Sequence, residues 1–358
     1  MTAVSWAEGL PRRSAARGLI AIAAIALVAF LGALSLGPVS IAPDRIWRVL
    51  LEALAGQPPG TGLALRERVV ILDVRLPRAV LGALAGAATA VAGAIMQGVF
   101  RNPLADPGLI GVSPGAALAA VGWIVLGGSL ALALPPLVQA LAMSLAAFGG
   151  GLATTLLIGR LALREGYTSV ATLLFAGLAL GALASAGTGV LVFLASEQQT
   201  REFLFWTLGS LGGATWLKVA LAAPFVFALL AASPFLARGL DALALGEAEA
   251  FHVGVRVERL KRAAIIAVAA GVGASVAACG VIGFIGLVVP HLVRLALGPG
   301  HRVLLPASAL LGAAVLLGAD IVARMLVAPA ELPLGVVTAL VGAPFFLWLL
   351  LRRRAALG

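Results

Sequence analysis

The stretch RLPRAVLGALAGAATAVAGAIMQGVFRNPLADPGLIGVSPGAALAA, from Arg75 to Ala120, decides the fold. Residues 79–100 are predominantly apolar, and the run is close to the ~20 residues that a helix needs to cross a bilayer. The run ends at Arg101-Asn102-Pro103, and a second apolar run follows a turn at residues 106–108. We therefore predict two membrane-spanning helices joined by a proline-rich loop.

The composition extends this pattern to the whole chain. The 358 residues are 61% hydrophobic and only 11% charged, whereas a soluble domain is about 25% charged. The mean hydropathy is +1.10, and apolar runs of membrane-spanning length recur along the chain. The sequence predicts an all-α polytopic membrane protein. A β-barrel is excluded because its strands would be short and alternating.

We expect ten membrane spans, which place both ends of the chain on one side. The expected spans are residues 19–37, 79–100, 107–128, 129–158, 169–195, 217–236, 263–282, 286–297, 304–325 and 333–351. Residues 203–216 are too short and glycine-rich to span, so a surface or re-entrant helix is expected there. The whole chain, 1–358, is expected to form one transmembrane domain.

The basic residues orient these spans. Of the 25 arginines and lysines, 16 fall on the side of the N-terminus, which should be cytoplasmic. Of the other nine, six crowd between residues 45 and 78, and five of these lie in a predicted periplasmic segment at 38–76 that includes a short amphipathic helix from Pro43. The net charge of +10 does not indicate nucleic-acid binding, because no dense basic stripe with interleaved aromatic residues occurs.

Three later segments, together with residues 75–120, carry a resemblance to a known family. They are LALGEAEAFHVGV (243–255), GFIGLVVPHLVRL (283–295) and GADIVARMLVAPAELPLGVVTALVGAPFFLWLL (318–350). The chain resembles the permease subunits of bacterial type II ABC importers for vitamin B12, iron-siderophores and haem. The wording FRNPLADPGLIGVS is closest to the haem importers.

The resemblance implies partners and a mechanism. It implies a multi-pass protein of the bacterial inner membrane, a homodimer whose translocation path lies on the two-fold axis. Two cytoplasmic ATP-binding subunits and a periplasmic substrate-binding protein would complete the importer, which works by alternating access. The chain itself contains no GxxxxGK[ST] motif, so we expect no ATP site, no catalytic residues and no cofactor of its own.

Arg75 and Arg78 flank Leu76-Pro77 at the mouth of the second span. They could be interfacial anchors that reach lipid headgroups, or an external basic patch for acidic side chains of a partner. The resemblance favours docking of the periplasmic binding protein and adds Arg324. Asp320, four residues before Arg324, could instead hold that arginine as an internal helix pair.

The connection at residues 238–262 is the largest cytoplasmic loop and is expected to hold a short helix, a glycine turn and a second helix. It could be a plain solvated loop. The resemblance makes it the segment that couples to the ATP-binding subunit, and it assigns Leu245, Gly246, Glu247 and Ala250 to that contact.

Small residues recur every fourth position in the fifth span, at Gly177, Gly181, Ser185 and Gly189. They could form a helix-packing ridge or the wall of a path for a bulky solute. In the resembling family this helix lines the path. The preceding residues Tyr167, Thr168 and Ser169 match its cytoplasmic gate.

The remaining polar residues suggest no second chemistry. His291 could be a haem ligand, but a polar residue at a helix kink is the preferred interpretation, and His252 and His301 are expected to be solvated. No metal-ligand cluster or catalytic set occurs in the sequence, which argues against a membrane enzyme. A secondary transporter driven by an ion gradient would be expected to carry paired carboxylates or broken helices at mid-membrane. The sequence offers only Asp320, near the end of a span, which argues against this alternative.

Overall fold

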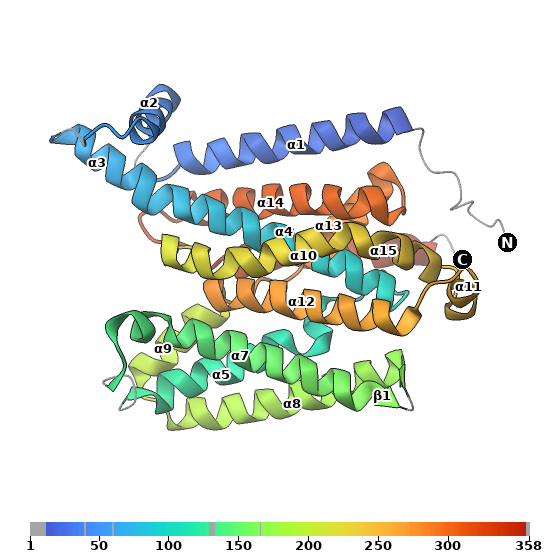
Figure 1. Cartoon of the computed structure of the whole chain (residues 1–358). Helices are drawn as coiled ribbons and strands as arrows, with labels where there is room; N and C mark the ends of the chain where they lie inside the picture. Colours follow the sequence, from blue (N-terminus) through green and yellow to red (C-terminus); the bar gives the residue numbers. More distant parts are fainter. Residues whose placement is uncertain (1–11, 39–40, 59–60, 129–132, 165, 356–358) are drawn as a thin grey trace.

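The computed structural model describes residues 12–38, 41–58, 61–128, 133–164 and 166–355. The long helices lie side by side along a common direction and form one bundle (Figure 1). The helices of the bundle are α1 (Arg12–Ser35), α4 (Leu76–Val99), α5 (Val112–Leu126), α7 (Pro136–Ala162), α8 (Val170–Leu194), α10 (Trp216–Leu243), α12 (Val257–Cys279), α13 (Ile285–Leu297), α14 (His301–Met325) and α15 (Leu334–Ala355).

Short elements connect these helices. They are α2 (Pro43–Leu54), α3 (Leu63–Val69), a π-helical turn η1 (Val70–Arg75), a 3-10 turn η2 (Pro107–Ile110), α9 (Glu197–Thr207), α11 (Glu247–His252) and a hairpin of β1 (Leu163–Arg164) with β2 (Tyr167–Thr168). The predicted amphipathic helix from Pro43 is α2, which buries Ile46 and Val49.

The ten predicted spans are confirmed. Within the described ranges, seven helices are long and apolar enough to cross a membrane, and three shorter apolar helices, α5, α13 and α15, accompany them. The continuous helix 63–99 comprises α3, η1 and α4. The short eighth span is α13, which starts at Ile285, one residue before the predicted start.

Several boundaries differ from the predicted ones, each for a local reason. The chain becomes α-helical only at Val112, because the Asp106 side chain caps a 3-10 turn by accepting a hydrogen bond from Gly108 N, 2.7 Å away. The fourth span starts at Pro136 instead of residue 129; residues 129–132 lie outside the described residues. α10 extends to Leu243 and α12 starts at Val257, so the connection is shorter than 238–262.

The surface helix expected at 203–216 lies earlier in the chain. α9 starts at Glu197, because Ser196 and Gln199 form a reciprocal capping box, and it ends at Thr207. The hydrophobic run had suggested the later position, whereas the capping residues set the true start.

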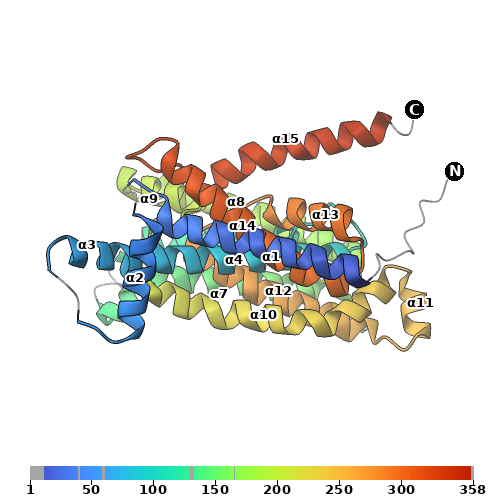
Figure 2. The same ribbon diagram turned by 90° about the horizontal axis from the view of Figure 1, so that it is seen from above.

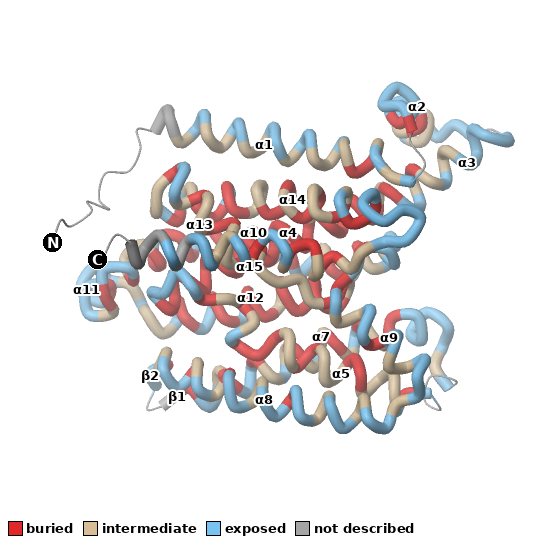
Figure 3. Tube along the Cα trace, turned by 180° about the vertical axis from the view of Figure 1, so that it is seen from behind, coloured by how far each residue is buried: buried red, intermediate tan, exposed pale blue. Residues whose placement is uncertain are grey.

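Helix α4 lies at the centre of the bundle, packed against α10, α12, α13 and α14. Its small residues make this possible. A Cβ at Gly86 would overlap the carbonyl group of Gly312 in α14, and one at Gly93 would overlap the carbonyl group of Gly286 in α13. Such contacts bring helix backbones close together. Figure 3 shows the buried residues concentrated in this central layer.

Two of the short helices start inside the bundle. The start of α13 lies against the middle of α4, because Gly286 touches Gly93. The turn before α5 reaches the same depth: a Cβ at Gly286 would lie 3.1 Å from Pro107. Both helices therefore begin partway through the bundle, and the loops before them run inside it.

The two ends of the bundle are distinct. α2 and α3 lie at one end, and α11 and the β-hairpin lie at the other, where α1 begins and α15 ends (Figure 1). We call them the α2 end and the α11 end. The helices of segments 38–76 and 238–262 thus lie at opposite ends of the bundle, and which end is periplasmic stays a prediction. Figure 2 shows α15 diverging from the bundle toward its C-terminus.

Candidate functional sites

The three arginines predicted for docking come together at the α2 end. Arg75 and Arg78 lie where η1 passes into α4, and Arg324 lies in the last turn of α14. Arg78 and Arg324 bind Asp320 of α14, Arg75 lies close to Arg324, and Glu331 reaches Arg78 from the loop that follows α14. We call these five residues the arginine cluster.

Arg78 is the centre of the arginine cluster. Its Nη2 lies 2.9 Å from Asp320 Oδ1 and 2.8 Å from Glu331 Oε2, while its Nη1 donates to Glu331 Oε1 at 2.9 Å. The other oxygen of Asp320, Oδ2, lies 3.1 Å from Arg324 Nε. The internal pair expected between Asp320 and Arg324 is therefore present, and Asp320 also serves Arg78.

The remaining guanidinium donors hold the end of α1. Arg75 Nη1 donates to the carbonyl oxygens of Leu34 and Ser35 at 2.7 and 2.9 Å, and Arg324 Nη2 donates to that of Ala33 at 3.2 Å. The last carbonyl groups of a helix lack helical partners and carry its negative partial charge. Cations here therefore fasten α1 to α4 and α14.

Burial decides which role these arginines have in this conformation. Arg75, Arg78 and Arg324 are 5%, 8% and 4% exposed, so they are interior residues and not anchors at lipid headgroups. The Glu331 side chain is 36% exposed, so solvent reaches the arginine cluster at this residue. The hydrogen bond from Arg78 lowers the pKa of Glu331 below its usual value. Docking through these arginines stays a prediction.

A second charged cluster lies at the α11 end. Lys261 in the first turns of α12 is 1% exposed. Its Nζ lies 3.0 Å from the carbonyl oxygen of Thr168, 2.8 Å from Glu247 Oε2 and 3.5 Å from Glu258 Oε1. Glu258 Oε2 in turn accepts a hydrogen bond from Thr168 N at 2.8 Å. These four residues form the lysine cluster, which joins a predicted gate residue to a predicted coupling residue.

The coupling segment presents an apolar surface. Leu245, Phe251 and Val253 are 75%, 73% and 69% exposed around α11. Gly246, at φ 139°, makes the turn into α11, a conformation that favours glycine. Ala250 is fully buried, so it packs within the chain, and a partner contact through it would require it to be uncovered. The assignment of Leu245, Gly246 and Glu247 to coupling stays a prediction.

The three predicted gate residues have different environments. Tyr167 is exposed, whereas Thr168 is buried in the lysine cluster. Ser169 is the N-cap of α8, since its Oγ accepts a hydrogen bond from Thr172 N at 3.2 Å. The hairpin thus leads directly into α8 and is held to α12.

The row of small residues on α8 divides into two parts. Gly177 packs against the carbonyl oxygen of Leu109, and Gly181 lies near Pro114, as a packing ridge requires. Ser185 and Gly189 are exposed, and no other atom lies within 4 Å of a Cβ placed at Gly189. The half of the row nearer the α11 end therefore packs, and the other half remains available to a path.

The histidines correct one expectation. His301 is not solvated: it is 5% exposed, and Asp241 Oδ1 lies 2.7 Å from its Nδ1 and accepts its backbone N–H at 2.9 Å. His252 is exposed as expected, and His291 packs edge-on to Phe345. No group of three or more possible metal ligands occurs in the part of the chain that the structure describes.

The sequence alone did not indicate Glu331, Glu258 and Lys261 as functional candidates. Lys261 had a detectable signal, because it is one of only two lysines, lies where a span begins and has Glu258 three residues before it. The contacts to Thr168 and Arg78 had none, because Thr168 is 90 residues from Glu258 and Arg78 is 253 residues from Glu331.

In the described residues, ten apolar helices form a bundle with charged clusters at both ends, which defines a multi-span membrane protein with the fold of a type II ABC importer permease. The chain belongs to the FecCD transport family, whose model matches residues 25–352. It is a permease subunit of an ABC importer of this family's haem, vitamin B12 and siderophore type.

Individual relatives support this assignment. The hemin transport system permease protein of Yersinia pestis is 48% identical over 79% of this chain and 83% of that protein. The vitamin B12 import system permease protein of Klebsiella pneumoniae is 41% identical over 86% of this chain and 90% of that protein. A metal-chelate type ABC transporter solved in an inward-facing conformation superimposes with a TM-score of 0.80 at 29% identity, covering 94% of this chain and 99% of that one.

Proposed function

We propose that this chain carries haem or a related iron complex from the periplasm to the cytoplasm, powered by two separate ATP-binding subunits. The observation that carries the proposal is the lysine cluster. One buried cation binds Glu247 beside the coupling surface and Thr168 at the hairpin before α8. A movement of α11 is therefore transmitted to the end of α8 without an intervening flexible segment.

The orientation follows from the distribution of charge. The α11 end is the cytoplasmic one in this proposal, because the majority of the arginines fall on that side. Both ends of the chain then lie in the cytoplasm. The exposed apolar residues Leu245, Phe251 and Val253 form the contact with the ATP-binding subunit.

The α2 end faces the periplasm and receives the substrate-binding protein. Acidic side chains of that protein would bind the arginine cluster from the open side, at Glu331. Because the three arginines are buried, docking requires them to exchange internal partners for external ones. Reversing the charge of Arg75 and Arg78 should abolish docking, and unchanged docking would remove this assignment.

Two copies of the chain form the transporter. A single chain would have to enclose a bulky solute alone, whereas a dimer places the path between copies. The exposed apolar face of α8, with Phe175, Leu178 and Phe193 at 73%, 73% and 87%, is available for that purpose. The exposed Ser185 and Gly189 lie on the same helix, and these small residues would line the path without binding the solute tightly.

The substrate assignment draws support from the relatives. The 48% identical relative is named for hemin, whereas relatives near 42% are named for vitamin B12. Haem is therefore the proposed substrate, and cobalamin and ferric siderophores are the alternatives. The chain would contact its substrate weakly and would hold no resident cofactor.

Uptake by reconstituted vesicles tests the proposal. The permease, its ATP-binding subunit and its binding protein are placed in liposomes and offered haem, cobalamin or a ferric siderophore, with and without ATP. We expect ATP-dependent uptake of haem. Preference for another solute would overturn the substrate, and uptake by the chain alone under an ion gradient would favour a secondary transporter.

A further inference from the structure

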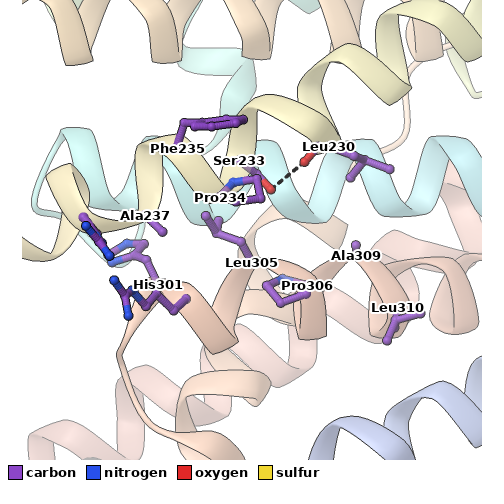
Figure 4. A pocket seen from close by; sticks show the side chains of 12 residues that line it. Leu230, Ser233, Pro234, Phe235, Ala237, His301, Leu305, Pro306, Ala309 and Leu310 are labelled. Carbon is purple, nitrogen blue, oxygen red and sulfur yellow. Dashed lines mark hydrogen bonds between the residues drawn. The ribbon is translucent and has the colours of Figure 1, made fainter.

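A cavity of about 840 Å³ lies between α10 and α14, toward the α11 end. Its walls are largely apolar, and they come from Leu230, Pro234 and Phe235 of α10 and Leu305, Pro306 and Leu310 of α14. His301 lies at one end of the cavity and Leu310 at the other (Figure 4). The cavity is therefore an elongated groove with a polar end and an apolar end. It has no part in the docking, gating and coupling roles assigned above.

Two prolines shape this groove. Pro234 and Pro306 lie inside α10 and α14, and proline in a helix removes a hydrogen bond and bends it. Because Pro234 has no backbone N–H, the Leu230 carbonyl oxygen lacks its usual helical donor. It accepts a hydrogen bond from Ser233 Oγ instead, at 2.8 Å (Figure 4). The proline in α10 therefore leaves no unpaired carbonyl oxygen at Leu230, as a lipid-facing helix requires.

The polar end of the groove is basic. Arg238 of α10 and Arg302 of α14 line it beside His301. Both arginines are exposed, and neither has an acidic group within 4 Å among the residues that the structure describes. Asp241, the acid bound to His301, lines the neighbouring cavity and not this one.

We propose that this groove binds an anionic phospholipid of the adjacent leaflet. The phosphate group would lie between Arg238 and Arg302, and an acyl chain would lie along Pro234, Leu305 and Leu310. Basic pockets between helices on the cytoplasmic side recognise anionic headgroups in this way. Guanidinium groups bind phosphate by paired, charge-assisted hydrogen bonds. Free phosphate would leave the apolar part of the groove unfilled, whereas a phospholipid fills both parts.

Native mass spectrometry of the full chain, extracted from nanodiscs of phosphatidylcholine and phosphatidylglycerol, tests the proposal. We expect the wild type to retain phosphatidylglycerol in preference to phosphatidylcholine. Replacing both arginines, Arg238→Gln with Arg302→Gln, should lower retention about 30-fold, since two basic residues near a headgroup are lost and each contributes a similar share of the binding free energy. The matched control is Arg160→Gln with Arg259→Gln, two exposed arginines at the same end.

A second pair of variants tests the apolar half of the groove. Ala309→Trp would fill it and should also reduce retention, whereas Ile25→Trp, on the exposed face of α1, should not. Equal retention by the arginine variant and the wild type would overturn the proposal. So would equal binding of phosphatidylcholine, or displacement of the lipid by excess inorganic phosphate. None of these results depends on transport, so the proposed function would stand or fall separately.

Discussion

The ammonium group of Lys261 lies 2.8 Å from the carboxylate of Glu247, and these two residues lie on opposite sides of the turn between α11 and α12. The same ammonium group binds the backbone of Thr168, so it is shared between α11 and the hairpin. A buried lysine is stable only when its charge is paired and hydrogen-bonded. If α11 or the hairpin moves away, Lys261 loses one of its hydrogen bonds, so a movement of either element changes the stability of the other's contact with Lys261.

Replacing Lys261 with Met should uncouple transport from ATP hydrolysis. The methionine keeps the apolar stem but binds neither Glu247 nor Thr168, so we expect uptake to fall about 10-fold or more while ATP hydrolysis by the complex persists. The measurement is the ratio of solute moved to ATP hydrolysed in vesicles. Lys261→Arg, which retains the charge, should recover part of this ratio. A normal ratio in the Met variant would contradict the role given to Lys261.

Loss of Arg78 should destabilise the chain far more than loss of a surface arginine. Arg78→Gln leaves Asp320, buried in the arginine cluster, with one cation fewer, and breaking a buried pair costs ~3–5 kcal/mol. The comparison is Arg45→Gln, which breaks the exposed pair with Glu67 and should cost no more than ~1 kcal/mol. Thermal unfolding in detergent measures both. Equal shifts would show that the arginine cluster contributes little to stability.

Glu331→Gln should strengthen docking of the binding protein. Glu331 occupies both Nη atoms of Arg78, so it competes with any external carboxylate for the same donors. We expect the dissociation constant to fall by up to about 10-fold, a change of about 1.4 kcal/mol. Glu67→Gln removes the same charge from the same end and is the control. No difference between the two variants would argue against docking through Arg78.

Acid should remove the contribution of Glu331 to stability. Its pKa is lowered in the folded chain, so its pairing with Arg78 stabilises the fold above the unfolded pKa and is lost as the pH falls through the folded pKa. The unfolding temperatures of wild type and Glu331→Gln should therefore differ by a constant amount near neutral pH, begin to converge below about pH 4.5 and coincide only below the folded pKa. A gap that persists in acid would mean that the carboxylate charge is irrelevant.

Gly93→Ala should disrupt the centre of the bundle. The added methyl group would overlap the Gly286 carbonyl, and backbone cannot move aside as a side chain can, so a loss of ~1–3 kcal/mol or more is expected. Gly189→Ala, on an open face of α8, should be neutral or slightly stabilising. Unfolding temperatures give the comparison, and similar values would show that α4 and α13 can separate at no cost.

The hydrophobic pattern was sufficient to predict the number of spans, because span length and charge position are local properties of the sequence. It also placed Arg75 and Arg78 at the mouth of a span, while Arg324 was added by the resemblance to the importer permeases, and the structure brings the three together. It did not show that they are buried, since the carbonyl oxygens of Leu34 and Ser35 and the carboxylate of Glu331 become partners only in the folded chain. The internal start of α5 was missed for a related reason: its apolar run is continuous, and only the Asp106 cap separates turn from helix.

The internal start of α5 has a consequence for biosynthesis. With 15 residues, α5 is about 22 Å long, less than the ~30 Å of a hydrocarbon core, so it cannot be inserted by its own hydrophobicity alone. Residues of α7 that cover its beginning, Gly151, Thr154 and Ile158, are translated about 40 residues later. Until they emerge, its first N–H groups would face lipid at a cost of several kcal/mol each. We therefore expect the nascent chain to hold α5 near the membrane surface and to draw it inward only together with α7.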